Sequence, residues 1–319
     1  KIIVGDLKIP GIVVLDLNKC EDQDWSKLSD ASAVVWEWDP QDSENCVLGK
    51  QYITGISDVK YRWSQYYQKN VVIACNSAGW VGIIDYETKA TLWEIYTNNS
   101  PHALELMPNG DLVLICSGGS NWENGDIRYY PISANNATTP SSSLTVANGH
   151  GVCWDPISNV LWALGGYGVT SFTVQNGGTA EAQLVATGTS VEFDSTLDND
   201  GHDMVPVYGN PGKYWVTAAR SVWVFDSQAL TLTNTYPHSG TISYRYVKGI
   251  ANFADGTVVL TKVDNTTSTD YSTVNLQVIT TEQTSGVIGG DTSICARNEA
   301  VTFESREFYK VHSFNENYQ

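Results

Sequence analysis

Three of the five histidines in this 319-residue chain recur at wide, similar intervals. His102, His150 and His202 are 48 and 52 residues apart, and Lys248 follows 46 residues after the last of them. Imidazole titrates near neutral pH, so a histidine can accept or donate a proton in catalysis. Three imidazoles can also hold a divalent metal, although this spacing is not a metal motif and adjacent cations would repel the ion. A fold that unites these positions would create one site containing bases and a positive charge.

Further cationic residues occur in the same context. Lys60 and Arg62 flank Tyr61, and Arg245 lies three residues before Lys248. The chain has 35 acidic and 18 basic side chains and a net charge of −17, so a cationic cluster would reverse the sign locally. In a concave site with walls of low dielectric constant, such a cluster would attract an anion. The overall charge argues against nucleic-acid binding, which needs clustered Lys and Arg.

The histidines belong to a repeating unit. Units begin near residues 61, 102, 150, 202 and 248, at intervals of 41, 48, 52 and 46 residues. Each contains three strands, a fourth follows in four of the five units, and turns such as Pro108-Asn109-Gly110 and Ala254-Asp255-Gly256 join the first two strands in some units. Four strands in a unit of this length are typical of a β-propeller blade. The first strand of each blade lines the central channel, so the histidines, Tyr61 and Lys248 should meet at one mouth of that channel.

Segments from both ends of the chain supply one more blade. Residues 2–7, 11–17 and 33–39 precede the first unit, and residues 307–314 follow the last. Pairing the C-terminal strand with the N-terminal ones closes the ring and removes exposed sheet edges. We therefore predict an all-β fold, a single six-bladed propeller of four-stranded blades over residues 1–319. Seven blades are the alternative, because residues 286–306 are not fully accounted for.

Sequence motifs favour an extracellular glycoprotein. Glycosylation sequons begin at Asn98, Asn136 and Asn265, and the chain starts without Met, as a mature protein would after signal removal. No apolar run approaches the ~20 residues that a membrane span needs. We therefore expect a secreted monomer with no membrane partner. Of the six cysteines, Cys20 and Cys46 would share a blade and could form a disulfide bond.

Four segments together resemble a family of secreted microbial β-propellers of unknown function. They are residues 35–39, residues 102–110, residues 150–155 with 161–165, and residues 202–217. The resemblance covers most of residues 1–280 and implies the propeller fold more than any activity. A more distant, architectural similarity is to propeller polysaccharide lyases, such as ulvan lyases, oligogalacturonate lyases and rhamnosyl-glucuronate lyases. Those enzymes carry His, Tyr and Arg or Lys in a funnel and cleave uronate-containing glycans by β-elimination.

The analogy with these lyases suggests roles for the candidate residues and an acidic oligo- or polysaccharide as substrate. β-Elimination needs a cation at the carboxylate, a base for the C5 proton and an acid for the departing O4 oxygen. The residues that would hold the carboxylate are Lys60, Arg62, Arg245 and Lys248. The base would be His102 or His202, the acid Tyr61 or Tyr244, and His150 an orienting or catalytic group. Trp63 and Trp154 would stack on sugar rings or else pack between blades. No cofactor is expected, unless a divalent metal binds the three histidines.

Other interpretations stay open. In WD-type propellers a Gly-His pair before the first strand is often structural, and Gly149-His150 and Gly201-His202 fit that description. A glycoside hydrolase would instead depend on paired carboxylates, for which the candidates are Glu37, Asp39, Glu105 and Asp155. A non-catalytic sugar-binding or interaction propeller is the third function. A multivalent lectin would repeat its binding residues in every blade, whereas the residues at the channel differ from blade to blade.

Overall fold

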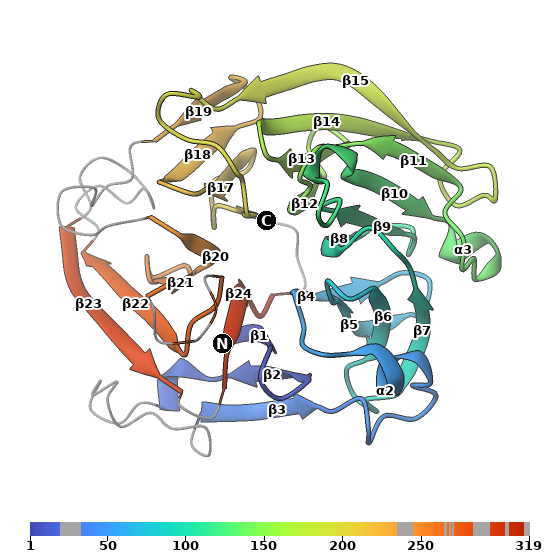
Figure 1. Ribbon diagram of the computed structural model, residues 1–319, viewed down its shortest axis with the longest axis horizontal. Coiled ribbons are helices and arrows are strands. Elements are labelled where there is room, and N and C mark those ends of the chain that lie inside the picture. Colours follow the sequence, from blue (N-terminus) through green and yellow to red (C-terminus); the bar gives the residue numbers. More distant parts are fainter. Residues whose placement is uncertain are drawn as a thin grey trace.

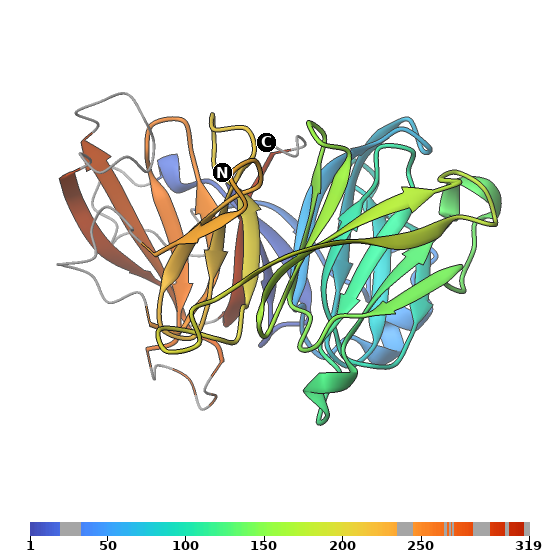
Figure 2. The same ribbon diagram turned by 90° about the horizontal axis from the view of Figure 1, so that it is seen from above.

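The computed structural model describes residues 1–19, 33–234, 245–264, 267, 269, 271–282, 294–303 and 306–315. Within them, six antiparallel four-stranded sheets surround a central axis (Figure 1). Seen edge-on, the strands run between the two faces of a disc (Figure 2). The predicted six-bladed propeller is therefore confirmed. Part of the stretch that left seven blades open is strand β23 (Ile294–Thr302), the outermost strand of an existing blade.

Five blades follow one another along the chain, and their strands are given from the axis outward. The first is β4 (Asp58–Ser64), β5 (Lys69–Cys75), β6 (Trp80–Asp85) and β7 (Thr91–Tyr96). The second is β8 (Pro101–Leu106), β9 (Leu112–Cys116), β10 (Asp126–Tyr130) and β11 (Ser142–Thr145). The third is β12 (Gly151–Asp155), β13 (Val160–Gly165), β14 (Gly168–Gln175) and β15 (Gln183–Glu192). The fourth is β16 (Asp203–Pro206), β17 (Lys213–Thr217), β18 (Val222–Asp226) and β19 (Thr231–Thr233). The fifth is β20 (Val247–Asn252), β21 (Val258–Lys262), β22 (Asn275–Glu282) and β23.

The sixth blade closes the ring. It consists of β24 (Phe308–Ser313), β1 (Ile2–Asp6), β2 (Gly11–Leu15) and β3 (Val34–Trp38), with β24 nearest the axis. Strands β24 and β1 pair antiparallel, and Ile3 lies opposite His312. The six inner strands contact one another in turn around the axis, with β24 between β20 and β4 (Figure 1). The closure predicted from the sequence is therefore observed, and the strand that lines the channel is the C-terminal one.

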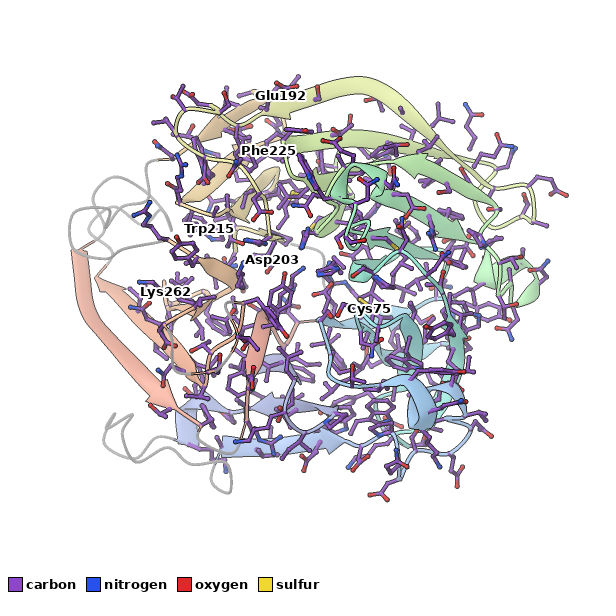
Figure 3. The ribbon with its side chains drawn as sticks, in the orientation of Figure 1. Cys75, Glu192, Asp203, Trp215, Phe225 and Lys262 are labelled. Atoms are coloured by element: carbon purple, nitrogen blue, oxygen red, sulfur yellow. The ribbon has the colours of Figure 1, made fainter. Side chains whose placement is uncertain are left out.

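The hydrophobic core is divided among the interfaces between neighbouring blades. Six clusters of buried apolar side chains occur, one for each interface. In the cluster between the first two blades, Val71 and Val81 pack with Leu104 and Leu114. Inner and middle strands thus have neighbours on both faces, which explains their nearly continuous apolar sequences. Figure 3 shows Asp203 beside the central axis and Glu192 at the outer rim of the propeller.

The turns that revealed the repeat have a stereochemical basis. Gly110, in the turn between β8 and β9, has φ +90°, and its N–H donates to the carbonyl of Met107 at 2.8 Å. A side chain there would also overlap Tyr66 of the first blade. Gly256 has φ +83° in the corresponding turn between β20 and β21. Glycine adopts this left-handed conformation without steric cost, so the motif marks the same corner in both blades.

Among the residues that the structure describes, helical structure is confined to short segments. They are η1 (Leu17–Lys19), α2 (Leu48–Tyr52), η4 (Trp122–Asn124) and α3 (Ile132–Asn135). Among the described residues, none of these helices has the length and apolar character that crossing a bilayer requires. Cys46, Cys75, Cys116 and Cys153 are buried free thiols, and Cys20, the suggested partner of Cys46, lies outside the described residues.

Candidate functional site

The histidines singled out from the sequence meet at one mouth of the channel. Corresponding inner strands run in the same direction, so their first residues gather at one face, here called the entry mouth. The ring centroids of His102 and His150 lie 4.3 Å apart, and those of His150 and His202 lie 5.4 Å apart. The Lys248 Nζ atom is 2.7 Å from Nε2 of His202. Four positions from four different blades therefore form one cluster.

Two of the imidazoles are held in a defined tautomer. The Nδ1 atom of His102 lies 2.9 Å from the carbonyl oxygen of Ser100, and Nδ1 of His150 lies 2.9 Å from that of Asn148. A carbonyl oxygen only accepts hydrogen bonds, so Nδ1 carries the proton in each ring. The lone pair is then on Nε2 of both His102 and His150. Each ring is thus arranged as a proton acceptor.

Burial keeps these imidazoles neutral. Loss of solvation is the largest effect on His102 and lowers its pKa to about 4. Burial also lowers the pKa of His150 well below its usual value, with the neighbouring imidazoles of His102 and His202 adding to the effect. A group whose charged form is disfavoured by burial titrates at lower pH when it is a base. Both rings are therefore uncharged at neutral pH.

The third imidazole is already engaged. The ammonium group of Lys248 can only donate, so Nε2 of His202 accepts its hydrogen bond. Asp200 places Oδ2 3.3 Å from the same nitrogen, and its Oδ1 accepts from Nδ2 of Asn148 at 2.5 Å. Burial acts to raise the pKa of Asp200, but the charge of the neighbouring Lys248 and the hydrogen bond from Asn148 favour the carboxylate and help to lower that pKa. In this arrangement His202 positions Lys248 and does not offer a free lone pair at Nε2.

The closing strand contributes residues that the sequence analysis missed. Lys310, on β24, is 1% exposed, and its Nζ atom donates to the carbonyl oxygens of His102 at 3.0 Å and His150 at 2.5 Å. The rings of Tyr309 and His102 are nearly perpendicular, with centroids 6.1 Å apart. The ammonium group therefore ties together the backbones that carry both neutral imidazoles. The alternation along β24, read as an inner strand, could have predicted that Lys310 and His312 face the channel.

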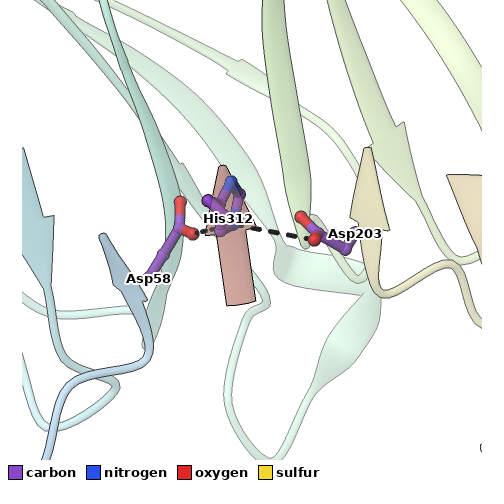
Figure 4. A group of neighbouring side chains, drawn as sticks. All are labelled: Asp58, Asp203 and His312. Atoms are coloured by element: carbon purple, nitrogen blue, oxygen red, sulfur yellow. Dashed lines mark ion pairs between the residues drawn. The ribbon is translucent and has the colours of Figure 1, made fainter. Parts of the chain in front are cut away.

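Deeper in the channel, His312 joins carboxylates of two other blades. Its Nε2 atom is 2.9 Å from Oδ1 of Asp58 and 3.6 Å from Oδ2 of Asp203 (Figure 4). Of the described residues, this trio alone brings three potential metal-ligand atoms within 4.8 Å of one another. Burial acts to raise the pKa of Asp58, but the charges of Lys310, His312 and Lys60 outweigh it and hold the pKa well below its usual range. A divalent cation would meet two ammonium groups here, so the trio fits a buried ion-pair network better than a metal site.

Lys60 and Arg62 are paired elsewhere in the channel. Arg62 donates from Nε and Nη2 to the two carboxylate oxygens of Glu105, at 2.8 and 3.0 Å. Lys60 lies 3.4 Å from the same carboxylate and donates to the carbonyl of Val152 at 2.8 Å. All three charged side chains are buried, and Lys60 and Arg62 line a cavity of only about 50 Å³ toward the opposite, exit mouth. The expectation that both cations stand with the histidines is therefore wrong, because Glu105 neutralises them deeper in the channel.

The aromatic candidates also lie away from the cluster. Side chains alternate along β4, so Tyr61 faces away from the channel and stacks on Phe314 with centroids 4.1 Å apart. Tyr61 is therefore packed between blades and does not stand with the histidines. Trp154 is buried between the second and third blades, whereas Trp63 is 46% exposed near the exit end of β4. Neither contributes to the entry mouth.

The remaining candidates described by the structure lie outside the entry-mouth cluster. Arg245 is exposed in the turn before β20, and Tyr244 lies outside the described residues. Among the hydrolase carboxylates, Glu37 pairs with Arg306 at 3.0 Å on the outer strand β3, and Asp39 accepts from the backbone of Gln41. Asp155 is buried and accepts hydrogen bonds from Ser158. Of the four, Glu105 lies in the channel, where two cations occupy it.

Fold and channel together define a class: six-bladed β-propellers whose axial channel is filled with ionisable side chains. Residues 25–281 match the model of a family described as "Family of unknown function (DUF6528)", and the chain belongs to that family. The resemblance to propellers of unknown function is thereby confirmed. A crystal structure of a protein of unknown function from Bacteroides caccae is similar in fold, with a TM-score of 0.57 and 11% identity over 98% of this chain and 97% of that one. A search of curated protein sequences found no significant match.

Proposed function

We propose that the entry mouth is the active site of a polysaccharide lyase that cleaves a uronate-containing glycan by β-elimination. The observation that carries the proposal is the pairing of two neutral, carbonyl-anchored imidazoles with the ammonium group of Lys248. A base of lowered pKa stays unprotonated, and a neighbouring cation attracts a carboxylate. Two features needed for removing a proton next to a carboxylate are thus supplied by residues within one cluster.

The proposed reaction assigns each step to a group of this chain. Lys248 binds the carboxylate of the uronate and stabilises the enolate-like charge that develops on it. Nε2 of His102 or His150 removes the C5 proton, the electron pair forms the C4–C5 double bond, and the bond to O4 breaks. Tyr309, whose pKa is raised by burial, donates its proton to the departing oxygen. Return of the imidazolium proton to Tyr309 restores both groups.

This assignment favours different bases from those suggested by the lyase analogy alone. His102 remains a candidate, His150 joins it as an equal, and His202 becomes a positioning residue for Lys248. The acid moves from Tyr61 to Tyr309. A glycoside hydrolase is less well supported, because its channel carboxylate, Glu105, is held by Arg62 and Lys60.

Location and partners follow from the substrate class. Acidic polysaccharides are extracellular, so we propose that the protein is secreted and acts as a monomer without a metal cofactor. Asn98 and Asn136, the first residues of two sequons, are exposed, while Asn265 of the third lies outside the described residues. Mass spectrometry of the protein recovered from culture medium of its native host would show whether these two asparagines carry glycans.

The test is a screen of acidic plant, algal and microbial polysaccharides for the ultraviolet absorbance of an unsaturated uronate. On an active substrate, we expect His102→Gln and His150→Gln to lower turnover, and the double variant to lower it on the order of 100-fold or more. Trp63→Ala, at the opposite mouth, is the control and should keep full activity. New reducing ends without ultraviolet absorbance, or full turnover in the folded double variant, would refute the proposal.

A further inference from the structure

A second cavity opens on the same face, beside the histidines. It has a volume of about 290 Å³ and is lined by Trp122, Asn148, Gly166, Tyr167, Asn199 and Asp200. These residues come from loops that precede or connect strands of the second, third and fourth blades. The volume is close to the ~300 Å³ at which small-molecule sites begin. The cleft can thus hold a ligand of about one sugar ring.

Two exposed aromatic rings form one wall of this cleft. Trp122 is 43% exposed and Tyr167 is 53% exposed, with centroids 5.3 Å apart. The Tyr167 hydroxyl donates to Glu123 at 2.7 Å, which fixes the ring. A side chain at Gly166 would crowd both the Trp122 ring and Asn148. Two adjacent aromatic faces that are open to solvent beside a cleft can stack on the apolar face of a sugar ring.

The rest of the cleft lining is polar and carries one negative charge. Asn148 donates to Asp200, and the Asp200 side chain remains 43% exposed, so its oxygens can accept further hydrogen bonds. Asn199 adds an amide, which both donates and accepts. Sugar hydroxyls match such mixed groups, whereas a carboxylate or phosphate would be repelled by Asp200. Aromatic stacking together with hydroxyl recognition selects a neutral pyranose.

The cleft is continuous with the proposed catalytic cluster. Asn148 accepts the hydrogen bond of His150 through its carbonyl, and Asp200 contacts His202 through its carboxylate. We infer that this cleft binds a neutral pyranose residue adjoining the acidic sugar whose carboxylate reaches Lys248. The inferred substrate is a glycan in which neutral and acidic sugars are neighbours, and this part of the inference rests on the proposed lyase function. As a binding site, it is measured without catalysis.

The binding test follows the indole N–H resonances in ¹⁵N-labelled protein. Loss of one signal in Trp122→Phe identifies Trp122 among the 11 tryptophans. Neutral methyl pyranosides, namely those of galactose, glucose, mannose, xylose and rhamnose, are then titrated, followed by galacturonate and glucuronate. We expect saturable shifts of the Trp122 resonance with at least one neutral sugar and weaker binding of the uronates. Tyr167→Ala should weaken neutral-sugar binding roughly 3- to 10-fold, and Asp200→Asn should reduce the discrimination against uronates.

A matched control separates this cleft from a general effect of exposed aromatic rings. Trp63→Ala removes a tryptophan of similar exposure at the exit mouth and should leave the Trp122 shifts unchanged. If no neutral sugar shifts the Trp122 resonance, or if Tyr167→Ala leaves binding unaltered, the subsite is refuted. Sugar binding without any elimination product refutes the lyase function alone. Elimination that is unaffected by Trp122→Ala refutes the subsite alone.

Discussion

Replacing Glu105 by glutamine tests whether that carboxylate has a structural role. Glu105 is 1% exposed and accepts two hydrogen bonds from Arg62, at 2.8 and 3.0 Å, with Lys60 3.4 Å away. Glutamine keeps the shape but removes the charge, so two buried cations would face a neutral amide. Removing one partner of a buried ion pair costs about 3–5 kcal/mol, because the other charge is left uncompensated. We expect a loss near the lower limit, about 3 kcal/mol, since the amide oxygen still accepts.

The measurement is equilibrium unfolding in urea, followed by tryptophan fluorescence. Glu37→Gln is the control, because that carboxylate is 49% exposed and its pairing with Arg306 should contribute less than about 1 kcal/mol. Replacing the whole channel group, Lys60→Met with Arg62→Met and Glu105→Leu, should recover most of the stability lost in Glu105→Gln. A Glu105→Gln protein within about 1 kcal/mol of the wild type would refute the reasoning. If that stable protein also lost the ability to release reducing ends from a glycan, Glu105 would instead be a catalytic carboxylate. The hydrolase function would then gain support.

Three further predictions concern protonation, packing and thiol reactivity. The pKa of His102 is about 4 in the folded protein and the pKa of His150 is lowered as well, so the unfolded chain binds these protons first as pH falls. The free energy of unfolding should therefore decrease from about pH 6.5 toward pH 4. The urea midpoints of the His102→Gln/His150→Gln variant should depend less on pH than those of the wild type. An equal pH dependence would show that these two histidines do not cause the loss of stability. Gly5→Ala should destabilise by about 1–3 kcal/mol, because the added methyl overlaps Ile56, whereas Gly177→Ala meets only ordinary contacts and should be nearly neutral in the same urea assay. Burial raises the pKa of Cys153 to about 12, so iodoacetamide should label it, by peptide mass spectrometry, only after unfolding; rapid labelling of the native protein would show that the channel opens.

The propeller was predictable because its signals are local and repeated. Turn glycines such as Gly110 and Gly256 mark equivalent corners, and apolar runs between them have strand length. The closing blade was predictable from the count of strands left at the two ends. The fifth blade's outer strand, β23, was missed because its sequence, with Arg297, Asn298 and Glu299 in succession, lacks the apolar character of the inner strands.

The site was predictable only in part. The sequence shows where a residue lies along a strand, but it does not show which residues of the neighbouring blades its side chain reaches. His102, His150, His202 and Lys248 came together because they occupy equivalent positions at the start of inner strands. Lys60 and Arg62 lie further along β4, and their partner, Glu105, comes from the next blade. Such pairing depends on strand tilt and side-chain length, which no motif encodes.

The placement of Tyr61 and the omission of Lys310 and His312 could have been corrected from strand alternation in the sequence. The alternation of Lys60, Tyr61 and Arg62 places the tyrosine on the opposite side of β4 from the two cations. The same alternation in β24 would have added Lys310 and His312 to the channel residues. Applying the two-residue period to every inner strand, including the closing one, therefore identifies the channel residues more reliably than the first residue of each repeat.

The position of β24 has a consequence for the order of assembly during translation. Asp58 and Asp203 leave the ribosome long before Lys310 and His312, which lie beside them in the finished ring. A nascent chain with five blades therefore holds two axial aspartates without the ammonium group of Lys310, which disfavours compaction around the axis. Docking of one late strand both completes the ring and brings Lys310 beside Asp203, so the last step of folding also completes the cluster of side chains at the entry mouth.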